Sequence, residues 1–201
     1  MRHGQSNANV QDRICSLPEN GTLPSEGLSP EGKEQVSRSS TNALPSAGLK
    51  SDTRIAIISS DFTRALETAQ ILRQTLLSND YINVTLRIDA RLRERNFGTE
   101  LEGKSGATEY ERVWAADVRR IEFGGVESPE SVLARSLAVV AGMKDAADCD
   151  VVFLVAHGDT LQILQSKDVR RGAEVSCWDH RSLVHLETAE IREVAFHSEI
   201  Q

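Results

Sequence analysis

The hydrophobic residues of this chain form short continuous runs that are separated by longer polar stretches. Three runs, at 54–58, 84–88 and 151–155, are rich in Val, Ile and Leu. Runs of this length and composition are typical of parallel strands that are buried on both faces. The first run ends in Ser59-Ser60-Asp61 and the last in Ala156-His157-Gly158, so each predicted strand is followed by small and polar residues.

Helical patterns alternate with these predicted strands. Apolar residues at helical spacing predict a helix from about Thr63 to Leu77, with Ser60 or Asp61 as its N-cap. A capping serine followed by proline is a common helix start. The other expected helices begin at Ser29-Pro30, run from Pro129 to about Ala146, and cover Asp159 to Gln165.

The remaining segments are predicted to be two strands and two long loops. The strands are expected at Ser182–Leu186 and Ile191–Phe196, and the loops at 10–27 and 99–127, the second around a short helix at Thr108–Val118. Strands that alternate with helices predict an α/β fold, here a three-layer α/β/α sandwich with a mostly parallel central sheet. The long loops should shape the mouth of any pocket at the strand ends.

Composition narrows the class of protein. The 201 residues, 39% hydrophobic and 26% charged, suit one domain over residues 1–201. No apolar stretch approaches a membrane span of ~20 residues, and the polar start does not resemble a signal peptide. Cys15, Cys149 and Cys177 are too few and too scattered for a disulfide framework or a metal knuckle, so we expect a reduced, cytoplasmic protein.

The net charge of −7 bears on the partners that the chain can take. It argues against general binding to nucleic acid. An anionic substrate would need a local cluster of arginines to overcome the overall field. Positive side chains near the predicted strand ends are therefore the candidates for binding such a substrate.

Two histidines stand beside glycines, in Arg2-His3-Gly4 and in His157-Gly158. A neutral histidine can act as a nucleophile, and phosphoryl transfer then passes through a phosphohistidine. Such transfer needs positive, planar donors around the phosphoryl oxygens, a role open to Arg2 and to Arg64 in the first helical turn after a strand. A leaving alkoxide needs a proton, for which Glu94, after the predicted strand at 84–88, is the candidate.

Each of these residues also has a simpler interpretation when taken alone. Arg64 would then be a surface arginine paired with Asp61 or Glu67. Glu94 would belong to a solvated Arg-Glu-Arg patch, and His157 would be a satisfied histidine at a strand end. Arg2-His3 would be a frayed terminus and Asn9 a turn residue. The joint placement at strand ends favours the chemical interpretation, and His180, His185 and His197, which lack it, are interpreted as surface or local packing residues.

Six elements, in order, resemble the histidine phosphatase superfamily, also called phosphoglycerate-mutase-like. The elements are Arg2-His3-Gly4-Gln5-Ser6-Asn7-Ala8-Asn9, Leu28-Ser29-Pro30-Glu31-Gly32, Ser59-Ser60-Asp61-Phe62-Thr63-Arg64-Ala65-Leu66-Glu67-Thr68-Ala69, Leu92-Arg93-Glu94 through Gly98, Gly124-Gly125-Val126-Glu127-Ser128 with one insertion, and His157-Gly158. Together they cover residues 2 to 158. Arg-His-Gly alone would be a weak signal, whereas six elements in the family's order are specific.

The resemblance implies a role for each matching residue. His3 would be phosphorylated, and Arg2, Arg64 and His157 would hold the phosphoryl group. Asn9 and the backbone at Gly158 would add hydrogen bonds. Glu94 would be the acid for the leaving group and then the base for water. The family needs no metal, and for this chain we expect no cofactor.

The chain departs from the family at its start. In the family a central hydrophobic strand leads into Arg-His-Gly, whereas here only Met1 precedes Arg2. Without that strand, neighbouring edges would lose their ladder partners and His3 would lie on a flexible end. We expect either a shortened form of a longer protein or another segment in the gap, and favour the first.

Three functions stay open at this point. Hydrolysis of a phosphomonoester is the first hypothesis, because the interval from Glu94 to His157 is too short for the insertion of the family's cofactor-dependent mutases. A phosphoglycerate-type mutase is an alternative, and a non-catalytic phosphate-binding protein is another. The partner is expected to be a small phosphorylated substrate of open identity. A second anionic group could meet basic residues of the loops, namely Arg13, Lys104, Arg112, Arg119 and Arg120.

Overall fold

The central element of the fold is an open sheet of three parallel strands. The computed structural model describes residues 1–46, 49–144, 149–168 and 175–196. The strands are β1 (Ile55–Ser59), β2 (Val84–Ile88) and β3 (Val151–Val155), in the order β2-β1-β3. All three match the predicted apolar runs. Their register aligns the strands end to end, with Ile55 opposite both Val84 and Val151.

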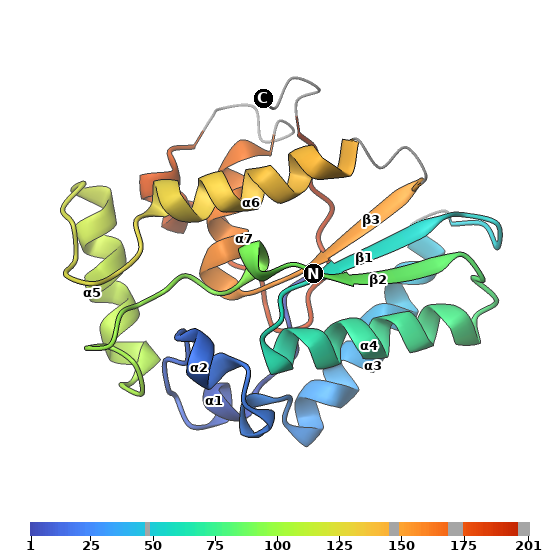
Figure 1. Cartoon of the computed structure of the whole chain (residues 1–201), viewed down its shortest axis with the longest axis horizontal. Helices are drawn as coiled ribbons and strands as arrows, with labels where there is room; N and C mark the ends of the chain where they lie inside the picture. Colours follow the sequence, from blue (N-terminus) through green and yellow to red (C-terminus); the bar gives the residue numbers. More distant parts are fainter. Residues whose placement is uncertain (47–48, 145–148, 169–174, 197–201) are drawn as a thin grey trace.

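Helices lie on both sides of this sheet and at its carboxyl end. Figure 1 shows α3 and α4 on one side, α6 and α7 on the other, and α5 beyond the strand ends. These are α3 (Pro30–Ser46), α4 (Thr63–Ser78), α5 (Gly106–Val118), α6 (Pro129–Lys144) and α7 (Gly158–Leu164). The α/β sandwich is thus confirmed, and so are the five expected helices. The end expected at Ala146 lies outside the described residues.

The alternation of side chains along β1 builds a core on each face of the sheet. Ile55 and Ile57 pack against buried residues of α3 and α4, including Val36 and Leu72. Ile58 points to the other face, where it packs in a cluster with Val139 of α6 and Leu161 of α7. Each face of β1 is apolar, which explains why its sequence is a continuous run without alternation.

Within the four described ranges, no helix combines the length and the apolar character that crossing a membrane requires.

The loop predicted at 10–27 contains short helices that the sequence pattern did not indicate. They are α2 (Pro18–Gly21) and the 3-10 turn η1 (Pro24–Glu26), and a further short helix, α1 (Asn7–Val10), ends at the first residue of this loop. Pro18 and Pro24 each stand at the start of one, where the missing N–H costs no hydrogen bond. Helices of three or four residues are too short to show a helical period. Further 3-10 turns are η2 (Ala90–Leu92), η3 (Gln165–Lys167) and η5 (Cys177–Ser182).

The prediction of two late strands is wrong, because neither Ser182–Leu186 nor Ile191–Phe196 forms a strand. Burial shows why the first was misread. Leu183 and Leu186 are 7% and 3% exposed, whereas Val184 is 68% exposed. The buried positions recur every three residues, whereas a strand with one buried face would bury every second residue. The segment therefore packs against the core without forming a strand.

The N-cap predicted for α4 is also wrong. Phe62 is the N-cap residue, with no side-chain cap. Ser60 Oγ instead accepts a hydrogen bond from the Phe62 N–H and lies 2.9 Å from His157 Nε2. Asp61 forms a two-point ion pair with Arg93, with N–O distances of 2.6 and 2.8 Å. Both polar side chains are therefore engaged by neighbouring loops instead of by the helix that follows them.

The first three residues run beside the carboxyl end of β3. The His3 N–H donates to the Ala156 carbonyl and the Ala156 N–H donates to the Met1 carbonyl, at 3.0 and 3.1 Å. On the other side, the Ala189 N–H donates to the His3 carbonyl at 3.0 Å. His3 is 3% exposed. We expected His3 to lie on a flexible end. In the structure its backbone is instead hydrogen-bonded on both sides, to Ala156 and to Ala189.

Candidate active site

The loop after His3 is positioned by contacts between two of the sequence motifs. A Cβ on Gly4 would lie 2.6 Å from the Gly32 carbonyl oxygen, and one on Gly32 would lie 2.0 Å from the Gln5 carbonyl oxygen. Only glycine allows so close an approach of two backbones. The Gly4 N–H donates to Thr68 Oγ1 of α4. These contacts hold the histidine loop against the starts of α3 and α4.

The hydrogen bonds of His3 assign its tautomer. Nδ1 lies 2.7 Å from the Gly4 carbonyl oxygen, which only accepts, so Nδ1 carries the proton. Nε2 accepts a hydrogen bond from Arg64 Nε at 3.2 Å and therefore bears a lone pair. Burial, and then Arg64 and Arg2, lower the pKa of His3 well below its ordinary value. The imidazole is thus neutral, and its Nε2 holds the lone pair that a nucleophile requires.

Arg64 is a buried cation beside that nitrogen. Its Nη2 donates to the Cys15 carbonyl oxygen at 2.9 Å, while its Nη1 has no partner among the described residues. The simple interpretation as a surface residue paired with Asp61 or Glu67 is wrong. A buried guanidinium nitrogen without a partner is costly unless a ligand supplies an acceptor.

His157 lies behind His3, with the two ring centroids 5.1 Å apart and the rings edge to face. Its Nε2 is 2.9 Å from Ser60 Oγ, and its buried Nδ1 has no partner among the described residues. Burial and Arg64 lower its pKa well below the ordinary value. Because Ser60 Oγ already accepts from the Phe62 N–H, its own hydroxyl is free to donate to Nε2. Nδ1 would then carry the remaining proton.

Arg2 is turned toward a segment that the sequence did not connect with it. Its Nη1 donates to the Leu186 carbonyl oxygen at 2.6 Å and lies 2.8 Å from His185 Nε2. His185, interpreted from the sequence as a surface or packing residue, therefore belongs to the site. Nothing in its local sequence indicates this contact. Gly158 faces the guanidinium, since a Cβ there would be 3.7 Å from Arg2 Cζ.

Glu94 presents its carboxyl group to the first turn of α7. Its Oε1 accepts hydrogen bonds from the Arg95 N–H at 2.9 Å and from the N–H and hydroxyl of Thr160, both at 3.3 Å. Burial, followed by the nearby charge of Asp159, raises the pKa of Glu94. The carboxyl group is therefore biased toward its protonated form, as a general acid requires.

An arginine of α6 holds the Glu94 loop in place. Arg135 donates to the carbonyl oxygens of Arg93 and Glu94, at 2.8 and 3.2 Å, and pairs with both oxygens of Glu127. The Glu127 N–H donates in turn to the Asn96 carbonyl oxygen. The Gly-Gly-Val-Glu-Ser motif thus contributes a carboxylate that orients Arg135, an effect that the sequence pattern did not indicate.

Asn9 has a structural role that accounts for its place in the first motif. Its Oδ1 accepts from the N–H and hydroxyl of Ser6, and its N–H donates to Ser6 Oγ, which makes a capping box for α1. This leaves the Asn9 Nδ2 group as the donor that can meet a ligand. The turn interpretation and the ligand interpretation are therefore compatible.

A cavity of about 120 Å³ brings most of the candidate residues together. Its lining includes Arg2, His3, Asn9, Arg64, Glu94 and Gly158. His157 is fully buried behind His3 and does not line it. Several further lining residues are not among the candidates predicted from the sequence. Two of them, Tyr110 and Trp114, share one face of α5, and their spacing of four is a signal that could have found them. The others missed include Ser16, Phe97, Asp159 and His185.

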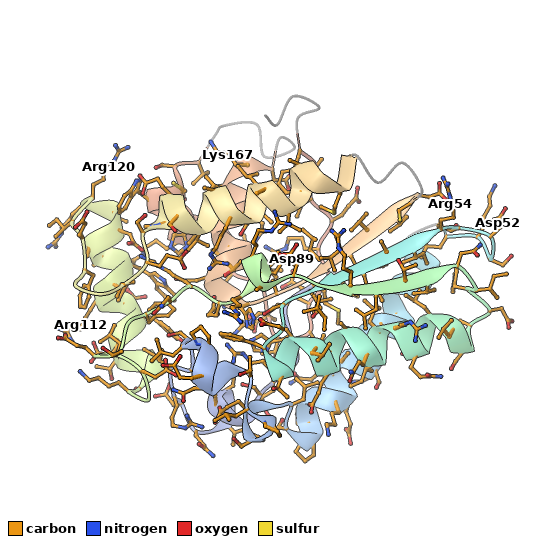
Figure 2. The ribbon with its side chains drawn as sticks, in the orientation of Figure 1. Asp52, Arg54, Asp89, Arg112, Arg120 and Lys167 are labelled. Carbon is orange, nitrogen blue, oxygen red and sulfur yellow. The ribbon has the colours of Figure 1, made fainter. Side chains whose placement is uncertain are left out.

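The basic residues considered for a second anionic group are mostly outside this cavity. Arg13 lines it, and is paired with Glu26 at 3.1 Å. Arg112 and Arg120 project outward from α5 and its C-terminal end (Figure 2), and Arg112 pairs with Glu109. In the described part of the chain, no three His, Cys, Asp or Glu side chains come together as a set of metal ligands.

Solved structures with the same architecture include two phosphatases. A mycobacterial glucosyl-3-phosphoglycerate phosphatase in complex with VO3 is 26% identical, with a TM-score of 0.68, over 94% of this chain and 87% of that one. A phosphoserine phosphatase from Entamoeba histolytica, in complex with 3-phosphoglyceric acid, is 18% identical (TM-score 0.63, 94% and 84% covered). Bacillus stearothermophilus YhfR is 21% identical (TM-score 0.69, 98% and 91% covered).

The comparison with curated proteins finds no match. A family model described as the histidine phosphatase superfamily (branch 1) matches residues 1–199, which is nearly the whole chain. It spans every motif described above. The chain therefore belongs to the histidine phosphatase superfamily, branch 1.

Proposed function

We propose that this protein is a phosphatase that hydrolyses small phosphomonoesters through a phosphohistidine on His3, without a metal ion. The single domain over residues 1–201 would carry the whole reaction. The observation that best supports this proposal is the pairing of a neutral, unprotonated His3 Nε2 with the Arg64 guanidinium in a cavity that Glu94 also lines.

The first step transfers the phosphoryl group to the enzyme. The lone pair on His3 Nε2 forms a bond to phosphorus while the bond from phosphorus to the ester oxygen breaks. Arg64 and Arg2 stabilise the charge on the outer oxygens, with Nη1 of Arg64 and Nε of Arg2 as donors that have no partner among the described residues. The leaving alkoxide takes the proton of Glu94, which becomes a carboxylate.

The second step returns the enzyme to its starting state. The Glu94 carboxylate takes a proton from a water molecule, whose oxygen forms a bond to phosphorus as the bond to Nε2 breaks. Inorganic phosphate leaves, His3 is again neutral and Glu94 is again protonated. In the role that the resemblance implies for His157, its buried Nδ1, which has no partner among the described residues, would have to turn toward a phosphoryl oxygen, because His157 does not line the cavity. A mutase would instead return the phosphoryl group to a second substrate molecule.

The proposal is tested by trapping the intermediate. With EDTA present, rapid quenching of the enzyme during turnover of p-nitrophenyl phosphate should yield a chain with one added phosphoryl group, located at His3 by peptide mass spectrometry. Phosphohistidine is labile to acid, so an alkaline quench should preserve it and an acid quench should lose it. Turnover without any such adduct, or turnover that EDTA abolishes, would contradict the proposed mechanism. An adduct stable to water but discharged by a phosphorylated product would favour the mutase.

Loss of Arg64 should weaken phosphate binding before any chemistry. Arg64→Ala is expected to raise the inhibition constants of phosphate and vanadate roughly 10- to 100-fold, because a buried charge-assisted hydrogen bond is lost. Vanadate is a suitable probe because the mycobacterial relative is described in complex with VO3. Arg73→Ala, on the exposed side of α4, is the matched control. An unchanged constant in Arg64→Ala would remove this residue from the phosphate site.

A further inference from the structure

The cavity has a negatively charged wall in addition to the arginine side. Asp159, two residues after His157, lines the cavity and is 5% exposed. Its two carboxylate oxygens lie 3.0 and 3.1 Å from the single Trp114 Nε1 donor. A carboxylate has about four acceptor positions, so this sharing leaves part of its capacity open toward the cavity.

The protein neutralises Asp159 only in part. Arg95 is 1% exposed and makes short contacts of 2.6 and 2.8 Å to both oxygens of Asp117, but lies 3.4 Å from Asp159. One guanidinium thus faces two buried carboxylates and binds the other one more closely. His180 Nε2 lies 3.6 Å from Asp117, on the side of this cluster that does not line the cavity. The negative charge of Asp159 is therefore only partly balanced by positive side chains among the described residues.

The other charged groups of the cavity are engaged elsewhere. Arg2 and Arg64 flank His3, where the phosphoryl group is proposed to bind, and Arg64 Nη1 is a buried donor without a partner. Arg13 pairs with Glu26. Glu94, with its raised pKa, tends to be neutral. A bound phosphomonoester would thus have its anionic end at the arginines, and Asp159 would be the anionic group left for the rest of the substrate.

Aromatic rings beside Asp159 suit the same kind of ligand group. Tyr110 and Trp114 both line the cavity and are stacked, with ring centroids 5.5 Å apart and an angle of 16° between the rings. Aromatic rings attract ammonium groups, and rings combined with a carboxylate bind them better than neutral alkyl groups. We propose that the preferred substrates are phosphomonoesters whose leaving group carries an ammonium group, bound by Asp159 beside Tyr110 and Trp114. This inference rests on the proposed function.

The test compares two substrates that differ in charge. Phosphoethanolamine carries an ammonium group where propyl phosphate carries a methyl group. The ratio of their kcat/KM values should fall about tenfold in Asp159→Asn relative to the wild-type protein, as expected for one charged hydrogen bond. Intrinsic reactivity and any change in Glu94 act on both substrates and largely cancel in this comparison. Asp150→Asn removes the same charge at the opposite end of β3 and should leave the ratio unchanged.

A binding measurement tests the inference even if no substrate is turned over or the Asp159→Asn variant does not fold. His3→Asn lacks the nucleophile, and calorimetry should show that it binds phosphoethanolamine about tenfold more tightly than propyl phosphate. Equal affinities, or an equal kcat/KM ratio in wild type and Asp159→Asn, would overturn the inference. If p-nitrophenyl phosphate is hydrolysed while these ratios are equal, the proposed phosphatase stands and only the ammonium preference fails. If no phosphate ester is hydrolysed, the binding comparison still decides the inference.

Discussion

Replacement of His3 by asparagine is expected to lower kcat for p-nitrophenyl phosphate by roughly a thousandfold or more, because the nucleophilic Nε2 is lost. Asparagine is the sharper substitution because its side-chain amide can still donate to the Gly4 carbonyl oxygen, the bond that Nδ1 makes in the wild-type protein. The loop between the histidine and Gly32 should therefore keep its shape. Initial rates at saturating substrate, with EDTA present, measure the effect.

Thermal unfolding separates a loss of chemistry from a loss of fold. His3 is buried, so His3→Ala leaves a cavity and should lower the melting temperature more than His3→Asn does. Both variants should be equally inactive if Nε2 is the nucleophile. Substantial activity in a folded His3→Asn protein would refute the phosphohistidine, whatever its stability.

The strands and the motif positions could be predicted because local sequence determines them. β1 is buried on both faces, β3 is mostly half-buried, and the edge strand β2 has three exposed residues. Each strand is nevertheless followed by the polar residues that a parallel sheet gathers at its carboxyl end. The strand-end rule predicts a common edge of the sheet for Arg64 and Glu94, and the resemblance to the family connects both residues with His3. Both line the same cavity with His3, although they are far apart in the sequence.

The rest of the site depends on contacts between distant segments. His185 reaches Arg2 because the 183–190 segment lies beside the first residues of the chain, and the spacing of its apolar residues suggested a strand instead. Asp159 received no role from the sequence because its environment comes from Trp114 and Arg95, on a helix and a loop that the pattern does not connect. The chemical type of a side chain can be read from the sequence, but the charged and polar groups around it are known only once the fold is known.

The start of the chain shows the same limit. From the sequence, the absence of an apolar strand before Arg2 threatened the order of the nucleophile. In the structure, the backbones of Met1, Ala156 and Ala189 bond to each other or to His3, so that hydrogen bonds from two sides take the place of a long ladder. Thr68 and Gly32 then fix the following turn. The precision of the nucleophile thus depends on neighbouring loops as well as on a strand.

Replacement of Glu94 by glutamine is expected to separate substrates by their leaving groups. An alkoxide must receive a proton as it leaves, so kcat/KM for an alkyl phosphate should fall roughly 10²- to 10⁴-fold. An aryl oxide leaves without a full proton, so the first step with p-nitrophenyl phosphate should fall far less, measured as the burst of nitrophenol in rapid mixing. Glutamine keeps the size of the side chain and can still accept at Oε1 from the Arg95 and Thr160 N–H groups.

The pH dependence gives the same role a second readout. The acid must be protonated, so wild-type kcat/KM for an alkyl phosphate should fall as pH rises through the pKa of Glu94, which burial and Asp159 raise above its ordinary value. The lowered pKa of His3 keeps the nucleophile neutral on the acidic side of that limb. In Glu94→Gln the descending limb should disappear, whereas Glu100→Gln, an exposed carboxyl in the same loop, should retain it. Equal losses on alkyl and aryl substrates with an unchanged pH profile would exclude Glu94 as the acid, because a residue that only shapes the cavity has no reason to distinguish leaving groups by their need for a proton.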